Sequence, residues 1–104
     1  MQILNKAILM AGLILAAGLA QADQKLAEKN ACMACHGIDK KIVGPAYQDI
    51  ASKYAKDKDA VTKLVASIKA GGSGKWGPIP MPAQAALSDA DAKTLAQWVL
   101  AFAK

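Results

Sequence analysis

Metal-binding side chains are scarce in this sequence of 104 residues, which has only two cysteines, Cys32 and Cys35, and one histidine, His36. A structural zinc site needs four ligands, and these residues supply three, so their number argues against zinc. A disulfide between the two cysteines would close so short a loop that it would remove little chain entropy. The candidate ligands stand together in one segment, "NACMACHGID".

Arginine is absent, and the positive charge comes from lysines spread along the chain, of which only Lys40 and Lys41 are adjacent. The formal net charge is +5. Because the lysines form no run, the pattern indicates an ordinary solvated surface and argues against nucleic-acid binding. A mildly positive face could still dock an acidic protein partner.

Long apolar runs are also missing, apart from one at the N-terminus. This run, Ala7–Ala20, follows Lys6 and leads into the small residues Ala20 and Ala22. It is shorter than the about 20 residues that a membrane-spanning helix needs. The layout therefore predicts a cleaved signal peptide over residues 1–22 rather than an anchor. The mature protein is expected to be residues 23–104, a single small exported domain without stable membrane insertion.

Alternation of apolar and polar residues, the sign of a strand, is absent as well, and helical periodicity takes its place. Apolar residues recur with helical spacing over 47–54, 61–68 and 95–102, and a further short helix is expected over 24–30. Asp59 is expected to cap the second of these helices, Gly71 to end it, and Ser88 with Asp91 to cap the third. Pro45 suits the start of the first. The predicted fold is all-α, with four or so short helices.

One segment, "GGSGKWGPIPMPAQ" over residues 71–84, holds most of the prolines and half of the glycines. Neither a helix nor a central strand tolerates that density, so it is predicted to be a loop. Long irregular loops in small domains are usually functional or disordered. Trp76 and Met81 within it favour an ordered and packed loop.

The sequence Cys-x-x-Cys-His at 32–36 is the signature of covalent attachment of a c-type haem. A thioredoxin-like redox site would need a βαβ context that the chain does not show. In one helical turn Cys32 and Cys35 lie on the same face, where both thiols can add to the vinyl groups of one porphyrin. His36 can then present its imidazole to iron. We therefore predict one covalently bound haem c, with disulfide chemistry as the main alternative.

A second iron ligand can be found by elimination, because no other histidine or cysteine exists. Met33 lies between the cysteines and cannot reach the opposite face of the ring, whereas Met81 on the proline-stiffened loop can. His36/Met81 ligation leaves no open position on the iron, which favours an electron carrier over an enzyme. The alternative is a haem peroxidase or gas sensor with an open distal iron site.

The segments "CMACH", "VGPAY", "WGPIPMP" and "LAQWVL" stand in the order and near the spacing found in the cytochrome c-551 (cytochrome c8) family, which the mature chain resembles. The resemblance implies a class I cytochrome c fold wrapped around one haem. It also implies that the Pro45 carbonyl accepts a hydrogen bond from the His36 ring and that the Trp76 indole donates one to a haem propionate. The residues that it places around the ring are Tyr47, Leu64, Ile68, Leu95 and Trp98.

Two positions depart from the family pattern. Ser67 stands where some members have an arginine near the propionates. Gln84 stands near where relatives place an asparagine that contacts the methionine sulfur, and its longer side chain predicts more freedom for Met81.

The function implied is that of a monomeric periplasmic electron carrier. The resemblance implies redox protein partners: a quinol-oxidising complex as donor, and nitrite reductase, cytochrome c peroxidase or a terminal oxidase as acceptor.

Overall fold

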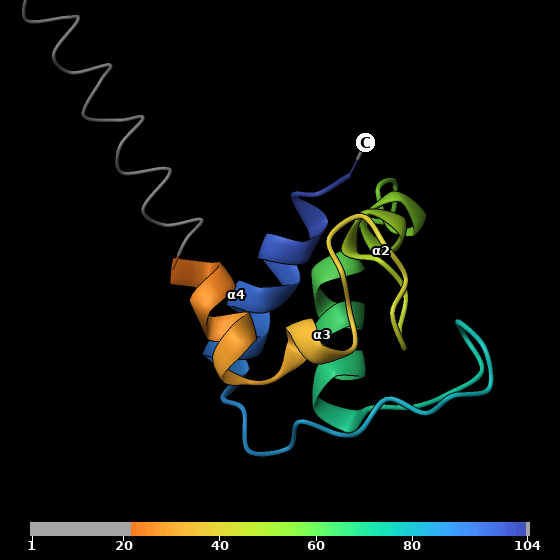
Figure 1. Cartoon of the computed structure of the whole chain (residues 1–104). Helices are drawn as coiled ribbons and strands as arrows, with labels where there is room; N and C mark the ends of the chain where they lie inside the picture. The colour runs from red at the N-terminus through yellow and green to blue at the C-terminus, as the bar shows by residue number, and fades with distance from the viewer. Residues whose placement is uncertain (1–21, 104) are drawn as a thin grey trace, which may run out of the picture.

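The computed structural model describes residues 22–103 of the chain (Figure 1). The predicted signal peptide, residues 1–22, falls outside the described residues apart from Ala22. Within residues 22–103, no helix is both long enough and apolar enough to cross a membrane.

Helices make up the regular structure of residues 22–103, which contain no strand and only two isolated backbone bridges. Residues 22–29 are helical. They are followed by the 3₁₀ helix η1 (Cys32–Ala34) and the α-helices α2 (Tyr47–Lys53), α3 (Ala60–Ala70) and α4 (Asp89–Leu100). The prediction of an all-α fold is confirmed, and each predicted helix is present.

Helix α4 is the centre of the packing, since it contacts both α2 and α3. Its predicted apolar face is correct: Leu95, Trp98 and Val99 are buried. The Trp98 ring meets the Tyr47 ring of α2 edge to face, with centroids 5.2 Å apart, an arrangement that aromatic pairs favour. Phe102, just beyond the helix, stacks on Tyr47 with centroids 6.2 Å apart. These rings join α2 to α4 and to the C-terminal end of the described chain.

Helix α2 begins at Tyr47, where the predicted apolar spacing begins, but Pro45 does not start it. Its N-cap is Ala46, which has an extended backbone, so Pro45 precedes the helix instead of starting it. The physical reason is that the first free amides of the helix bind an earlier segment. The Tyr47 amide donates to the Gly37 carbonyl (2.9 Å), and the Gln48 amide donates to the Ile38 carbonyl (3.0 Å). These hydrogen bonds tie α2 to the residues that follow His36.

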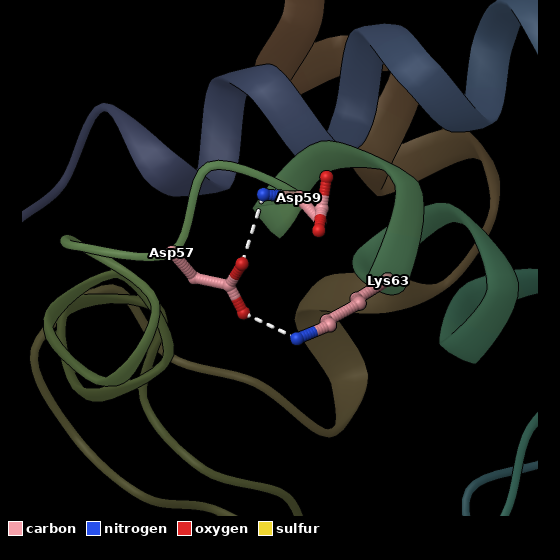
Figure 2. Close-up of polar contacts among 3 residues, drawn as sticks. All are labelled: Asp57, Asp59 and Lys63. Atoms are coloured by element: carbon pink, nitrogen blue, oxygen red, sulfur yellow. Dashed lines mark hydrogen bonds and ion pairs between the residues drawn. The ribbon is translucent and has the colours of Figure 1, made fainter.

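Helix α3 is capped by a different residue from the one expected. Asp59 occupies the N-cap position, but its side chain accepts no capping hydrogen bond, because its backbone is not in the extended conformation of most N-cap residues. Asp57 acts instead (Figure 2): its carboxylate accepts hydrogen bonds from the Asp59 amide (2.8 Å) and the Lys63 ammonium (2.6 Å). The start of α3 is therefore held from two residues upstream.

The junction between α3 and α4 is the predicted loop, which leaves the end of α3 and returns to the start of α4 (Figure 1). Gly71 ends α3 with a φ of 66°, in the region that favours glycine. A Cβ there would also collide with the Met81 carbonyl. At the far end, the Ser88 hydroxyl accepts from the Asp91 amide (3.1 Å), as the capping pattern predicted. Lys69 and Asp89 form an ion pair between the two helices.

The contact between Asp57 and Lys63 makes stability depend on pH. The hydrogen bond from Lys63 lowers the pKa of the Asp57 carboxyl below its ordinary value of 3.8. A carboxyl with a lowered pKa stabilises the fold above its unfolded pKa and loses that effect as the pH falls through the folded value. Asp57→Asn is therefore expected to lower the free energy of unfolding at pH 7, with a deficit that shrinks below about pH 3.8.

Urea denaturation of both proteins across the acid range measures this deficit. Asp39→Asn is the matched control, since Asp39 is exposed and forms no ion pair within the described part of the chain. A deficit of the same size at neutral and strongly acid pH would contradict the assignment.

Candidate functional site

The two cysteines are brought together by η1. In a 3₁₀ helix the side chains of residues three apart eclipse one another, and here the Cys35 and His36 amides both donate to the Cys32 carbonyl (3.3 and 3.0 Å). The Cys35 carbonyl in turn accepts from the Val43 and Gly44 amides (3.1 and 2.8 Å). Both thiols line the same cavity. The turn is thus held at both ends.

The Cys32 thiol is half-buried. Burial raises its pKa above the ordinary value of 9.0, whereas a redox-active dithiol has a lowered pKa at its attacking sulfur. Cys32 and Cys35 form no disulfide. Within residues 22–103, no three side chains of His, Cys, Asp or Glu gather to hold a metal ion by themselves. The raised pKa of the Cys32 thiol does not favour the redox-active dithiol alternative.

His36 is fixed on three sides. Its Nδ1 atom lies 2.7 Å from the Pro45 carbonyl oxygen, and with the proton on Nδ1 it donates to that oxygen. The Nε2 lone pair is then free to bind a metal. The ring stacks on Tyr47 with centroids 5.3 Å apart. Gly44 closes the third side, because a Cβ there would come within 2.6 Å of the ring carbon Cε1.

Gly44 is a residue of the site for which the sequence predicts no role. Its only signal was its place beside Pro45 in "VGPAY". Because Gly44 precedes Pro45, whose carbonyl accepts from His36, it lies close to the imidazole ring. This closeness depends on the way residues 37–44 fold back, which the sequence does not show.

A cavity of about 330 Å³ lies beside these residues, within the usual size range of cofactor and ligand sites. Cys32, Cys35 and His36 line it, as do Trp76 and Met81 of the loop. Ser67 of α3 also lines it. The residues that the family resemblance places around the ring all line the same cavity, namely Tyr47, Leu64, Ile68, Leu95 and Trp98. Residues predicted from far-apart segments thus meet at one place.

The backbone of Met81 is held where the two ends of the loop meet, at the Gly72–Met81 pair, which we call the neck of the loop. Its amide donates to the Gly72 carbonyl (2.8 Å), and the Gly72 amide donates back to the Met81 carbonyl (3.1 Å). The Gln84 amide donates to the Ile68 carbonyl (3.1 Å), which ties the end of the loop to α3. Met81 itself is half-buried. The backbone of Met81 is therefore positioned by the end of α3.

The tip of the loop, residues 73–80 beyond the neck, is more exposed than predicted. Residues 72–80 are exposed, and 38% of the Trp76 surface is accessible, so the prediction of a packed loop is right at the neck and wrong at the tip. The physical reason is that side chains of the tip border the cavity instead of packing on the helices. Trp76 has a contact that the sequence did not indicate: the Lys53 ammonium lies 4.5 Å from the centre of its ring.

The contact between Gly44 and His36 can be tested by adding one methyl group. Gly44→Ala is expected to push the imidazole from the Pro45 carbonyl and to lower the free energy of unfolding by about 1–3 kcal/mol, the usual cost of overpacking. NMR of the His36 ring and urea denaturation measure the two effects. Gly74→Ala is the control for the His36 resonances only: a Cβ at Gly74 meets no atom within 4 Å, but its φ of 97° disfavours any side chain there, so its own unfolding free energy is not compared. Unchanged His36 resonances in Gly44→Ala would refute the contact.

A substitution at Tyr47 is expected to stabilise the fold, in contrast to Gly44→Ala. The buried Tyr47 hydroxyl has no hydrogen-bond partner among the described residues. Burial also raises its pKa far above the ordinary value of 10.0, so it stays neutral. An unsatisfied buried polar group costs about 1–3 kcal/mol. Tyr47→Phe is therefore expected to raise the free energy of unfolding by up to that amount, measured by urea denaturation. Tyr54→Phe, the control, should bring no gain, and a marked loss in Tyr47→Phe would reveal a partner for the hydroxyl.

The comparisons with known proteins agree with this geometry. The family model for cytochrome c matches residues 20–102. Cytochrome c-552 of Nitrosomonas europaea is 58% identical over 90 residues, covering 86% of this chain and 87% of that protein. Cytochrome c-551 of Pseudomonas aeruginosa is 50% identical over 94 residues, covering 89% of each.

A solved structure shows the same similarity. The crystal structure of wild-type Nitrosomonas europaea cytochrome c552 matches with a TM-score of 0.74 at 56% identity, covering 76% of this chain and 98% of that one. The cavity, the Cys-x-x-Cys-His turn and these matches lead to one conclusion. The chain belongs to the cytochrome c family, as a small class I monohaem cytochrome c, an electron-transfer protein whose cofactor is a covalently bound haem c.

Proposed function

We propose that this protein is a periplasmic electron carrier that exchanges one electron at a time through a haem ligated by His36 and Met81. The observation that carries the proposal is that these two side chains, from segments far apart in the sequence, line one cavity together with both cysteines. The His36 ring is also held with Nδ1 at the Pro45 carbonyl, which leaves Nε2 for the iron.

The core of the described residues fits such a cofactor. No large side chain is fully buried; the large apolar residues of the core remain 3–8% exposed. Most of them also line the cavity, namely Tyr47, Ile50, Tyr54, Leu64, Leu95, Trp98 and Val99. The cavity therefore has the core on one side and the exposed loop on the other. An apolar ring seated there would be covered by α2, α3 and α4.

Each residue of the site has a proposed task. Cys32 and Cys35 would hold the haem through thioether bonds, and His36 Nε2 and the Met81 sulfur would bind its iron. The Pro45 carbonyl keeps the proton of His36 on Nδ1, which sets the ring orientation and raises the basicity of Nε2. The Trp76 indole donates a hydrogen bond to a propionate.

The bound haem supplies one-electron iron chemistry, with a potential that His/Met ligation raises. The chain contributes positioning and exclusion of water. The His36 contacts hold one ligand still, the neck of the loop holds the backbone of the other, and the apolar cavity wall keeps water away. A site that moves little between its two oxidation states suits rapid electron transfer.

The proposed location is the periplasm, reached through a cleaved signal peptide over residues 1–22. The proposed donor is a quinol-oxidising complex, and the proposed acceptors are nitrite reductase, cytochrome c peroxidase or a terminal oxidase. The formal net charge of the whole chain is +5, and it stays positive without Lys6 of the proposed signal peptide. This excess of lysine supports docking to acidic partner surfaces, which would make association depend on salt.

Ligation by Met81 is tested by the spectrum of the oxidised protein. The wild type is expected to show the near-red charge-transfer band of a methionine–iron bond. Met81→Ala is expected to lose that band, to have a lower reduction potential and to bind carbon monoxide when reduced, because a coordination position opens. Met33→Ala is the matched control, since Met33 packs against the core beside the cysteines and should keep the band.

A pyridine haemochrome assay on the same samples measures haem attachment separately. A wild-type protein that contains haem c but lacks the band and binds carbon monoxide rapidly would refute the electron-carrier assignment in favour of an open distal site.

A further inference from the structure

Two contacts between lysines and aromatic rings join the loop to the end of α2. The Lys53 ammonium lies 4.5 Å from the centre of the Trp76 ring, and the Lys75 ammonium lies 6.0 Å from the centre of the Tyr54 ring. Lys53 and Tyr54 are neighbours at the end of α2, and Lys75 and Trp76 are neighbours in the loop. The two pairs are therefore reciprocal: each segment supplies one cation and one ring.

Hydrogen bonds do not provide this connection. The tip of the loop is closed on itself by the Gly74 amide, which donates to the Gly77 carbonyl (2.8 Å). Among the described residues, no hydrogen bond joins residues 73–80 to a helix. The Gly72–Met81 pair holds only the neck. The lysine–ring contacts are thus the polar contacts that link the tip to α2.

The geometry ranks the two contacts. A cation is attracted to an aromatic face within about 6 Å of the centroid, and tryptophan gives the strongest attraction. Lys53 over Trp76 lies well inside this limit, and Lys75 over Tyr54 lies at its edge. Tyr54 is 7% exposed, so packing holds its ring in place as a platform. Lys53 over the face of Trp76 leaves the indole N–H, in the plane of the ring, available to another acceptor.

We propose that Lys53 is a positioning residue: with Trp76, and supported by Lys75 and Tyr54, it forms a clasp that holds the loop across the mouth of the cavity. The clasp limits how often the segment carrying Met81 opens. Trp76, Lys75 and Tyr54 line the cavity, so closing the clasp places them at its edge. The link to Met81 rests on the proposed function.

Two measurements on the haem-loaded protein test the clasp. Amide hydrogen exchange at Met81, whose amide donates to the Gly72 carbonyl, reports opening of the loop, and the rate at which saturating imidazole replaces Met81 on oxidised iron reports opening at the ligand. Lys53→Met keeps the apolar stem and removes the charge. Both rates are expected to rise about two- to fivefold, as for the loss of one exposed cation–π contact. Lys75→Met should have a smaller effect. Lys53→Arg keeps the positive charge and should leave both rates at their wild-type values.

Lys56→Met is the matched control, because Lys56 is an exposed lysine near the end of α2 that lies over no ring among the described residues. An equal effect of Lys56→Met would show a general charge effect and overturn the proposal, as would wild-type rates in Lys53→Met. In a Trp76→Leu background, Lys53→Met should add nothing further, and additive effects would also overturn the clasp. If wild-type iron lacks the methionine band, the proposed ligation fails, whereas amide exchange at Met81 still decides the clasp.

Discussion

The position of the His36 ring is the constraint on which the rest of the structure depends. The ring lies between the Pro45 carbonyl, 2.7 Å from Nδ1, and the Tyr47 ring, and a side chain at Gly44 would not fit beside it. To reach this arrangement the chain must turn back after Cys35. The turn is held by the Val43 and Gly44 amides on the Cys35 carbonyl. Tyr47 also contacts Trp98 of α4 and Phe102, so the position of the His36 ring is linked to the position of α4.

The loop that lines the other side of the cavity is held mainly at its two ends. The loop over residues 71–84 has little regular structure, and its order comes from its ends: the Gly72–Met81 pair and the Gln84 amide on Ile68. Gly71 allows the chain to pass close to the Met81 carbonyl. One iron ligand is thus proposed on a rigid turn and the other on a loop fixed at its neck. Any variation in loop opening would affect the second ligand alone, and that is where the lysine–ring contacts act.

The small size of the domain explains why the cavity is central. A chain this short buries too little surface to be comfortably stable alone. The fully buried core residues are alanines, namely Ala27, Ala51, Ala92 and Ala96, while the large side chains border the cavity. Covalent haem is the cofactor of this family, and a cofactor among these side chains would complete the core. Fold and function then depend on the same contacts.

Local patterns in the sequence determined the helices, their apolar faces, the Ser88 cap, the loop and the attachment signature, because periodicity and backbone chemistry act over a few residues. The candidate ligands also followed, since His36 has no competitor and Met81 has only one after the predicted signal peptide, Met33. The tertiary structure decided which residues far apart in the sequence come into contact. Gly44 against His36, Asp57 in place of Asp59, the exposed loop tip and Lys53 over Trp76 all depend on how the chain folds back. A sequence pattern carries no distance between such segments, and only packing around a common cavity sets one.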